Sequence, residues 1–152
     1  MIPKYLKPQK EYDLIRLGQD NDGGYLVEKE SINKSNGLIT LGLGYDWTFE
    51  KSFKKLTKKA IVCYDHTVNY SGIKKLCRKL TSSYFFRMFK PKYVFRKKVF
   101  NHMFKNIFLY ADYKKFFSND AEHIEKRIGS GNGGIMLSEI LKSKKDMFPA
   151  FL

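Results

Sequence analysis

The sequence has only two cysteines, Cys63 and Cys77, and it contains no long apolar run. Two cysteines, one in a predicted strand and one in a predicted helix, do not make the disulfide framework of a small secreted protein. No segment reaches the roughly 18 apolar residues of a membrane span. The N-terminus, Met1-Ile2-Pro3-Lys4-Tyr5, has no signal-peptide core. We therefore expect a soluble protein in a reducing cytoplasm.

Acidic residues are absent between Asp65 and Asp112, although the chain contains 15 of them. The same stretch holds eleven Lys or Arg and eleven Phe or Tyr, so it supplies most of the net charge of +14. Pro91 separates a predicted basic helix at 73–80 from a second helix whose apolar stripe runs over 95–108. Residues 70–112 are therefore predicted to be a distinct basic aromatic segment with helical structure.

The sequence also lacks a cluster of His, Cys, Asp and Glu at metal-ligand spacing, so we predict no metal site. His102 and His123 have no partners at such spacing, and we assign them no chemistry. The length of 152 residues, with 43% hydrophobic and 16% aromatic residues, is typical of one packed domain and argues against disorder.

Apolar runs alternate with turns along the whole chain. A strand at 12–17, turn residues at 19–24 and a strand at 25–27 predict a hairpin, which a polar turn at 31–36 follows. Strands at 38–41 and 60–64 flank a helix at 47–58 that Asp46 can cap. A polar strand at 123–128, a glycine loop and a helix at 135–142 complete the order. This order predicts an α/β fold with a mostly parallel sheet flanked by helices.

Two glycine motifs are candidates for ligand binding. Gly42 and Gly44 follow the strand at 38–41, and Asp65 ends the next strand about twenty residues later, as in a Rossmann-like βαβ unit. Such glycines let the backbone approach a nucleoside, while the acid accepts the ribose hydroxyls. The second motif, Gly129–Gly134, matches G-x-G-x-x-G but follows a charged strand, and we interpret it as a connector. The first motif predicts a site for a dinucleotide or an adenosyl cofactor.

Three short motifs occur in order around this site. They are Asp22-Gly23-Gly24-Tyr25, the glycine loop ending in Phe49-Glu50, and Asp65-His66-Thr67. Together they resemble a subgroup of the FkbM-type S-adenosylmethionine-dependent methyltransferases, from about residue 16 to residue 152. Thr40 stands where the broader methyltransferase loop commonly has an acid, and Asp46 where it commonly has a third glycine, as in the subgroup.

The resemblance implies an incomplete Rossmann-like class I methyltransferase fold with S-adenosyl-L-methionine as cofactor. It implies O-methyl transfer to a hydroxyl of a glycan or small molecule. The cofactor contacts that we expect are Leu41, Gly42, Gly44, Tyr45, Asp65 and His66. Asp65 would accept both ribose hydroxyls, a pairing that suits a carboxylate.

Several of these residues have a second interpretation. His66 either contacts the ligand or acts as a base near neutrality, or it only helps to build a strand-end turn. Asp22, Gly23 and Gly24 form either a loop over the cofactor or a plain hairpin turn. Tyr45 and Trp47 lie next to the glycine loop, where they either shape the adenosyl pocket or, as we expect for Trp47, pack in the core.

The resemblance divides the chain into an N-terminal hairpin at 1–36 and the N-terminal part of a methyltransferase domain at 37–152. The family continues with an Ile-Asp-Ile-Glu-Gly-like strand, whereas this sequence reaches Phe148-Pro149-Ala150-Phe151-Leu152 and stops. We therefore expect a truncated chain with weak cofactor binding and little or no turnover by itself.

The basic aromatic segment supports a competing function. Lys and Arg interleaved with Phe and Tyr suit RNA, through phosphate contacts and base stacking. An apolar stripe with a basic opposite side also suits an anionic membrane. The interpretation that we favour is an insertion whose aromatic residues pack on the sheet and whose lysines are solvated, because the stripe has ordinary core periodicity.

Overall fold

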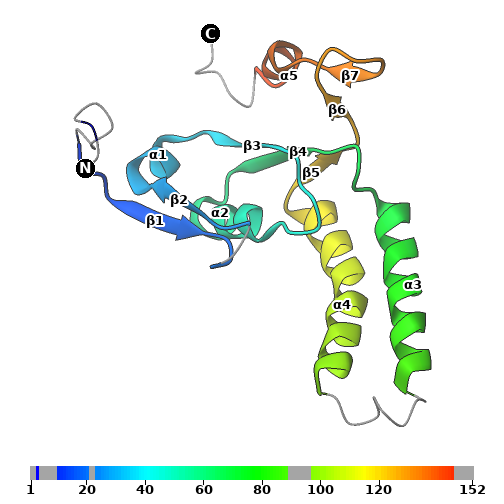
Figure 1. Cartoon of the computed structure of the whole chain (residues 1–152). Helices are drawn as coiled ribbons and strands as arrows, with labels where there is room; N and C mark the ends of the chain where they lie inside the picture. The colour runs from blue at the N-terminus through cyan, green and yellow to red at the C-terminus, as the bar shows by residue number, and fades with distance from the viewer. Residues whose placement is uncertain (1–2, 4–9, 21–22, 89–96, 146–152) are drawn as a thin grey trace.

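A computed structural model of the chain describes residues 3, 10–20, 23–88 and 97–145 (Figure 1). Its centre is a parallel sheet of β3 (Gly37–Leu41), β4 (Ala60–Tyr64) and β5 (Glu122–Ile124), in the order β3-β4-β5. Thr40 pairs with Cys63, and Cys63 pairs with His123. Helices lie on both faces of this sheet, so the predicted mixed α/β architecture with a parallel sheet is confirmed.

Helix α2 (Thr48–Thr57) connects β3 to β4, within a residue of its predicted bounds. The N-cap residue is Trp47, one position after the predicted cap, and Asp46 accepts a 3.0 Å hydrogen bond from the Thr48 amide at the start of the helix. Glu50 and Phe53 are the buried residues of the helix. The helix ends at Lys58, whose left-handed conformation (φ 58°) turns the chain toward β4.

The N-terminal hairpin pairs β1 (Leu14–Leu17) with β2 (Tyr25–Glu28) in antiparallel register, as predicted. Helix α1 (Lys29–Lys34) follows it, so the polar turn predicted at 31–36 is wrong for most of its length. Burial of Ile32 gives this short helix an apolar contact, and Lys34 forms a 2.5 Å ion pair with Glu30 one turn away. Because most residues of this segment are polar, the sequence pattern indicated a turn and not a helix.

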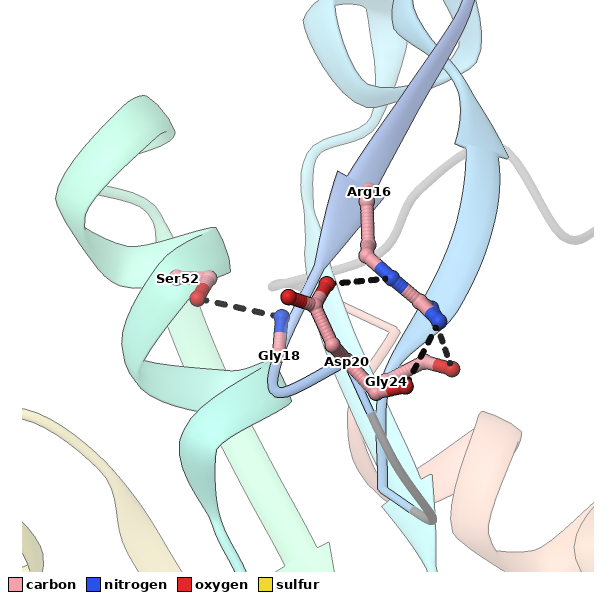
Figure 2. Close-up of polar contacts among 5 residues, drawn as sticks. All are labelled: Arg16, Gly18, Asp20, Gly24 and Ser52. Carbon is pink, nitrogen blue, oxygen red and sulfur yellow. Dashed lines mark hydrogen bonds and ion pairs between the residues drawn. The ribbon is translucent and has the colours of Figure 1, made fainter.

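Arg16 holds the tip of this hairpin together and Gly18 attaches it to α2 (Figure 2). The Arg16 guanidinium donates to the Asp20 carboxylate at 3.1 Å and to the Gly24 carbonyl at 3.2 Å. The Gly18 amide donates to the Ser52 hydroxyl on α2 at 3.2 Å. The hairpin is therefore fixed beside the helix that follows the glycine loop.

Helices α3 (Tyr70–Met88) and α4 (Lys97–Asn119) form a long pair that extends away from the sheet (Figure 1). The helical structure predicted for 70–112 is confirmed at 70–88 and at 97–112, and α4 continues to Asn119. At its base, Tyr113 and Phe116 are buried in the core. Farther out, Phe86 is 70% exposed and Phe108 is 60% exposed, so not every aromatic residue packs on the sheet. Pro91 and Phe95 lie outside the described residues.

The polar strand predicted at 123–128 is two strands, because β5 stops at Ile124 and β6 (Arg127–Ile128) begins a separate pair with β7 (Gly134–Ile135). A turn with a 2.8 Å bond from the Lys126 amide to the Ile124 carbonyl separates them. The second glycine motif joins β6 to β7 as a connector, closed by a 2.8 Å bond from the Gly134 amide to the Gly131 carbonyl. Helix α5 (Leu137–Ser143) follows.

The core has two parts, because alternate side chains of β4 point to opposite faces of the sheet. Ile61 and Cys63 pack on the face covered by α2, α3 and α4. Val62 and Tyr64 pack on the other face against Ile140 of α5. Both cysteines are buried and free. No helix in the described part of the chain has the length and apolar character needed to cross a bilayer.

Candidate functional site

A pocket of 550 Å³ lies at the carboxyl end of β3, where ligands bind in open α/β sheets. It follows the side of β3 that carries no neighbouring strand among the described residues. The residues that line it come from the hairpin tip, β3, the glycine loop and the first turn of α2: Gly23, Tyr25, Leu38, Ile39, Thr40, Leu41, Gly42, Leu43, Gly44, Tyr45, Asp46, Phe49 and Glu50. The pocket therefore contains four of the six predicted cofactor contacts, Leu41, Gly42, Gly44 and Tyr45.

Gly42 and Gly44 occupy left-handed backbone conformations, with φ values of 88° and 59°. A Cβ atom added at either position would meet no atom within 4 Å, so the loop leaves open space beside its backbone. The Gly42 amide donates to the Tyr64 carbonyl at 2.8 Å and continues the pairing between β3 and β4. The two glycines thus allow a tight turn and close approach of a ligand.

Asp65 lies behind the glycine loop and is buried. Its Oδ2 atom accepts hydrogen bonds from the amides of Leu43 at 2.7 Å and Gly44 at 3.0 Å. Its Oδ1 atom accepts from the Thr67 amide at 2.7 Å, the Thr67 hydroxyl at 2.6 Å and the Val68 amide at 3.3 Å. Asp65 does not line the pocket, so the structure gives it the role of a brace between the loops after β3 and β4.

These hydrogen bonds determine the protonation of Asp65. Burial by itself would raise the pKa of this carboxyl, but the bonds from Thr67, Gly44 and Leu43 outweigh burial and hold the pKa well below its usual range. The side chain is therefore an anion at neutral pH. Its contact with ribose hydroxyls stays a prediction, since both oxygens are engaged by protein donors in this structure.

Glu50 is a buried carboxylate that the predicted set of site residues does not contain. It lies in the first turn of α2, lines the pocket and is 3% exposed. The Thr40 hydroxyl donates to its Oε1 atom at 2.8 Å, whereas its buried Oε2 atom has no partner within the described part of the chain. The sequence could have indicated its burial, because Glu50 lies three residues from both Trp47 and Phe53, which are on the buried face of the helix.

The hairpin tip reaches the same pocket. Gly23 lines it, and an added Cβ at Gly23 would lie 2.5 Å from the Asp46 carboxylate. The Gln19 side chain donates to that carboxylate at 3.0 Å. Gly24 supports the turn without lining the pocket, and Asp22 lies outside the described residues. The hairpin therefore both folds as a turn and contributes one wall of the pocket.

The other residues that the sequence analysis singled out lie outside the pocket. His66 is exposed and does not line it. Trp47 is buried in the core as predicted, and its indole donates to Asp112 of α4 at 2.9 Å. His123 hydrogen-bonds to Tyr113 and lies 3.1 Å from the Asp65 carbonyl oxygen, which is a structural role. The described residues contain no group of three His, Cys, Asp or Glu that is arranged to hold a metal ion.

Comparisons with protein-family models, with curated proteins and with solved structures find no match to this chain. Evidence for the function of the chain therefore comes from the pocket and from the motifs that surround it.

Proposed function

We propose that this chain binds S-adenosyl-L-methionine beside the glycine loop and belongs to the FkbM-type methyltransferases that its motifs resemble. The observation that carries the proposal is the conformation of Gly42 and Gly44 at the carboxyl ends of two parallel strands. Both glycines have positive φ and open space where a side chain would lie. That combination suits a ligand that must contact the backbone closely.

The charge of the pocket also fits this cofactor. S-adenosylmethionine is a cation at its sulfonium and carries an ammonium group as well. Glu50 places a buried carboxyl in the pocket, and Asp46 adds a second acid beside the loop. No lysine or arginine is among the described residues that line the pocket. A pyrophosphate needs donors or cations, so these acids favour an adenosyl cofactor over a dinucleotide.

The role of Asp65 follows from its hydrogen bonds. A ribose contact at its Oδ2 atom would compete with the amides of Leu43 and Gly44. We therefore propose that Asp65 acts chiefly as a positioning residue, which fixes the glycine loop, and that any ribose contact replaces one of these bonds.

Methyl transfer from this cofactor needs little acid–base catalysis from the protein. When bound, the cofactor supplies an activated methyl group, so the chain's own residues have to orient the acceptor oxygen and exclude water. The acceptor class that we propose, a hydroxyl of a glycan or small molecule, comes from the resemblance. None of the described residues is assigned as a catalytic base, and His66 is exposed and does not line the pocket.

A thermal-shift titration of the whole chain tests the proposal. S-adenosylmethionine or S-adenosylhomocysteine at about one hundred times Kd is expected to stabilise the protein by about 2.7 kcal/mol and to raise Tm by several degrees. NAD and ATP at the same concentrations serve as matched adenosine-containing controls. An equal shift with all four ligands, or no shift with the two adenosyl-sulfur ligands, would contradict the proposal.

The second candidate function is binding of RNA or an anionic membrane by the α3–α4 pair. The observation that favours it is aromatic exposure beside positive charge, because Phe85 and Phe86 are 51% and 70% exposed. A shallow pocket on α3 is lined by Lys74, Lys75, Arg78 and Lys79, with two serines. Such a surface suits phosphate contacts and stacking.

Salt separates the two functions. Binding of single-stranded RNA or of phosphatidylserine vesicles by the α3–α4 pair should weaken steeply as salt rises, whereas adenosyl-cofactor binding should change little. A double substitution, Lys75→Ala with Lys79→Ala, should reduce only the salt-dependent binding. If the variant and the wild-type chain bind RNA and vesicles equally, the second candidate is wrong.

A further inference from the structure

Glu50 carries an open hydrogen-bonding position inside the proposed cofactor pocket. The residue is buried in the first turn of α2 and is 3% exposed. Its Oε1 atom accepts a 2.8 Å hydrogen bond from the Thr40 hydroxyl, which orients the carboxyl group. The Oε2 atom is buried and lacks a protein partner in the described part of the chain. Buried polar atoms are nearly always paired, so this atom points to a missing partner.

The surroundings of Glu50 favour a cation as that partner. The positively charged side chain nearest in sequence, Lys51, is engaged by Asp112 of α4. No ion pair involving Glu50 occurs among the described residues, and the nearby Asp46 adds negative charge. Burial, the largest cause, together with Asp46 raises the pKa of Glu50 above its ordinary value. A bound cation would relieve both penalties.

An acid at this place is also supported by the helix. The first turn of an α-helix favours negative charge, because its amide groups give that end a partial positive charge. The same turn faces the glycine loop, since Glu50, Gly42 and Gly44 line one pocket. A ligand beside the loop therefore lies within the same cavity as the open carboxyl oxygen.

We propose that Glu50 binds the ammonium group of the ligand in this pocket, with Thr40 as the positioning residue that orients the carboxylate. The inference rests on the proposed function, in which the ligand is S-adenosylmethionine or its product, and the ammonium is that of the amino-acid part. An ammonium is a compact cation with three donors, and one donor matches the single open Oε2 atom.

The experiment is a thermodynamic cycle on the whole chain, measured by titration calorimetry. The two ligands are S-adenosylhomocysteine and its deaminated analogue, which lacks only the ammonium group. The two proteins are the wild-type chain and Glu50→Gln, which keeps the size of the side chain and the acceptor for Thr40. Wild-type protein is expected to bind the deaminated ligand about 10- to 100-fold more weakly. In Glu50→Gln the difference between the ligands should fall to about twofold or less, because the charged partner is gone.

The control variant is Glu30→Gln, which neutralises an exposed acid of α1 that forms an ion pair with Lys34. It should bind both ligands like the wild-type chain. If wild-type protein and Glu50→Gln discriminate between the ligands to the same degree, the assignment of Glu50 is wrong while the proposed function stands. If the wild-type chain binds neither ligand, the proposed function fails, and the Glu50 assignment fails with it.

The wild-type arm keeps the test decisive if Glu50→Gln does not fold. Equal affinity of the wild-type chain for the two ligands would by itself overturn the assignment, because no group would then recognise the ammonium. Circular dichroism of each variant, recorded before titration, shows which arm of the experiment applies.

Discussion

The carboxylate of Asp65 accepts a 2.7 Å hydrogen bond from the backbone amide of Leu43, so the acid that ends one strand holds the glycine loop that follows its neighbour. The Gly44 amide donates to the same oxygen. This relationship links the two halves of the βαβ unit across the edge where the pocket lies. It makes the shape of the loop dependent on the charge of one side chain.

Asp65→Asn should destabilise the protein strongly. The amide group of asparagine carries no charge, and its NH₂ donor would face a set of donors instead of accepting from them. Loss of charge-assisted hydrogen bonds at a buried site is expected to lower the free energy of unfolding by about 2–4 kcal/mol. Urea denaturation of the wild-type chain and the variant measures the difference.

The matched control is Asp13→Asn, at an exposed acid in a 3.6 Å ion pair with Lys29. Exposed pairs contribute about 0–1 kcal/mol, so this variant should unfold close to the wild-type midpoint. Equal stability of the two variants would show that Asp65 does not brace the loop.

The contribution of Asp65 should also depend on pH. Because its folded-state pKa lies below the unfolded-state value of about 3.9, folding favours the ionised form, and the stabilisation is fully present above about pH 5. It is lost as the pH falls through the unfolded-state pKa and below it. The stability gap between wild type and Asp65→Asn should therefore shrink from about pH 7 to about pH 3. A stability difference between wild type and Asp65→Asn that grows as the pH falls would contradict a lowered pKa of Asp65.

Without ligand, the stability difference between wild type and Glu50→Gln should depend on pH in the opposite direction from that of Asp65→Asn. The raised pKa of Glu50 means that folding favours its protonated form, so ionisation lowers wild-type stability as the pH rises above the unfolded-state value of about 4.3. We expect the ligand-free variant to be more stable than wild type near neutral pH, with the advantage disappearing in acid. Melting curves at several pH values test this. A less stable variant at every pH would indicate that the carboxylate has a partner that supports the fold.

Lys58→Gly should stabilise the chain. Lys58 has a left-handed conformation at the end of α2, which glycine adopts without steric penalty, and we expect a gain of about 0.5–1 kcal/mol. Lys55→Gly, in the last turn of the same helix, is the control and should lose about 1 kcal/mol. Chemical denaturation that gives both variants the same sign would contradict the assignment of the helix end.

Gly24→Ala should open the hairpin tip. An added Cβ would lie 1.7 Å from the carbonyl oxygen of Gln19, a backbone atom that cannot move aside, so we expect a loss of about 2 kcal/mol or more. Gly131→Ala is the control, because its Cβ would meet the Arg127 side chain at an ordinary distance of 3.6 Å. If both variants melt at the same temperature, the inference that the hairpin tip is closely packed around Gly24 is wrong.

Local sequence patterns predicted much of this fold. The apolar runs of β3 and β4, the helical spacing between Trp47 and Phe53, and the turn residues of the hairpin are all short-range signals. Helix α1 was missed because its only buried residue, Ile32, gains its contact from distant segments. The break between β5 and β6 depends on pairing partners that the local sequence does not identify.

The site was predicted less completely than the fold. Gly42 and Gly44 were identified because they follow an apolar strand at the spacing of a βαβ unit, and in the structure both have positive φ and line the pocket. Asp65 was identified by spacing, but spacing does not reveal that protein amides already occupy its oxygens. Glu50 was missed because a charged residue is ordinarily expected at the surface, whereas here Thr40 and the helix start accommodate it.

Calorimetric titration of S-adenosylhomocysteine into the wild-type chain, and into a Gly44→Val variant, measures cofactor binding beside the glycine loop. We expect saturable binding at one site by the wild-type chain. We expect loss of that binding in the variant, because valine both strains the positive φ and fills the open space beside the loop. Absence of binding to the folded wild-type chain, or equal binding by a folded variant, would contradict the proposed cofactor binding.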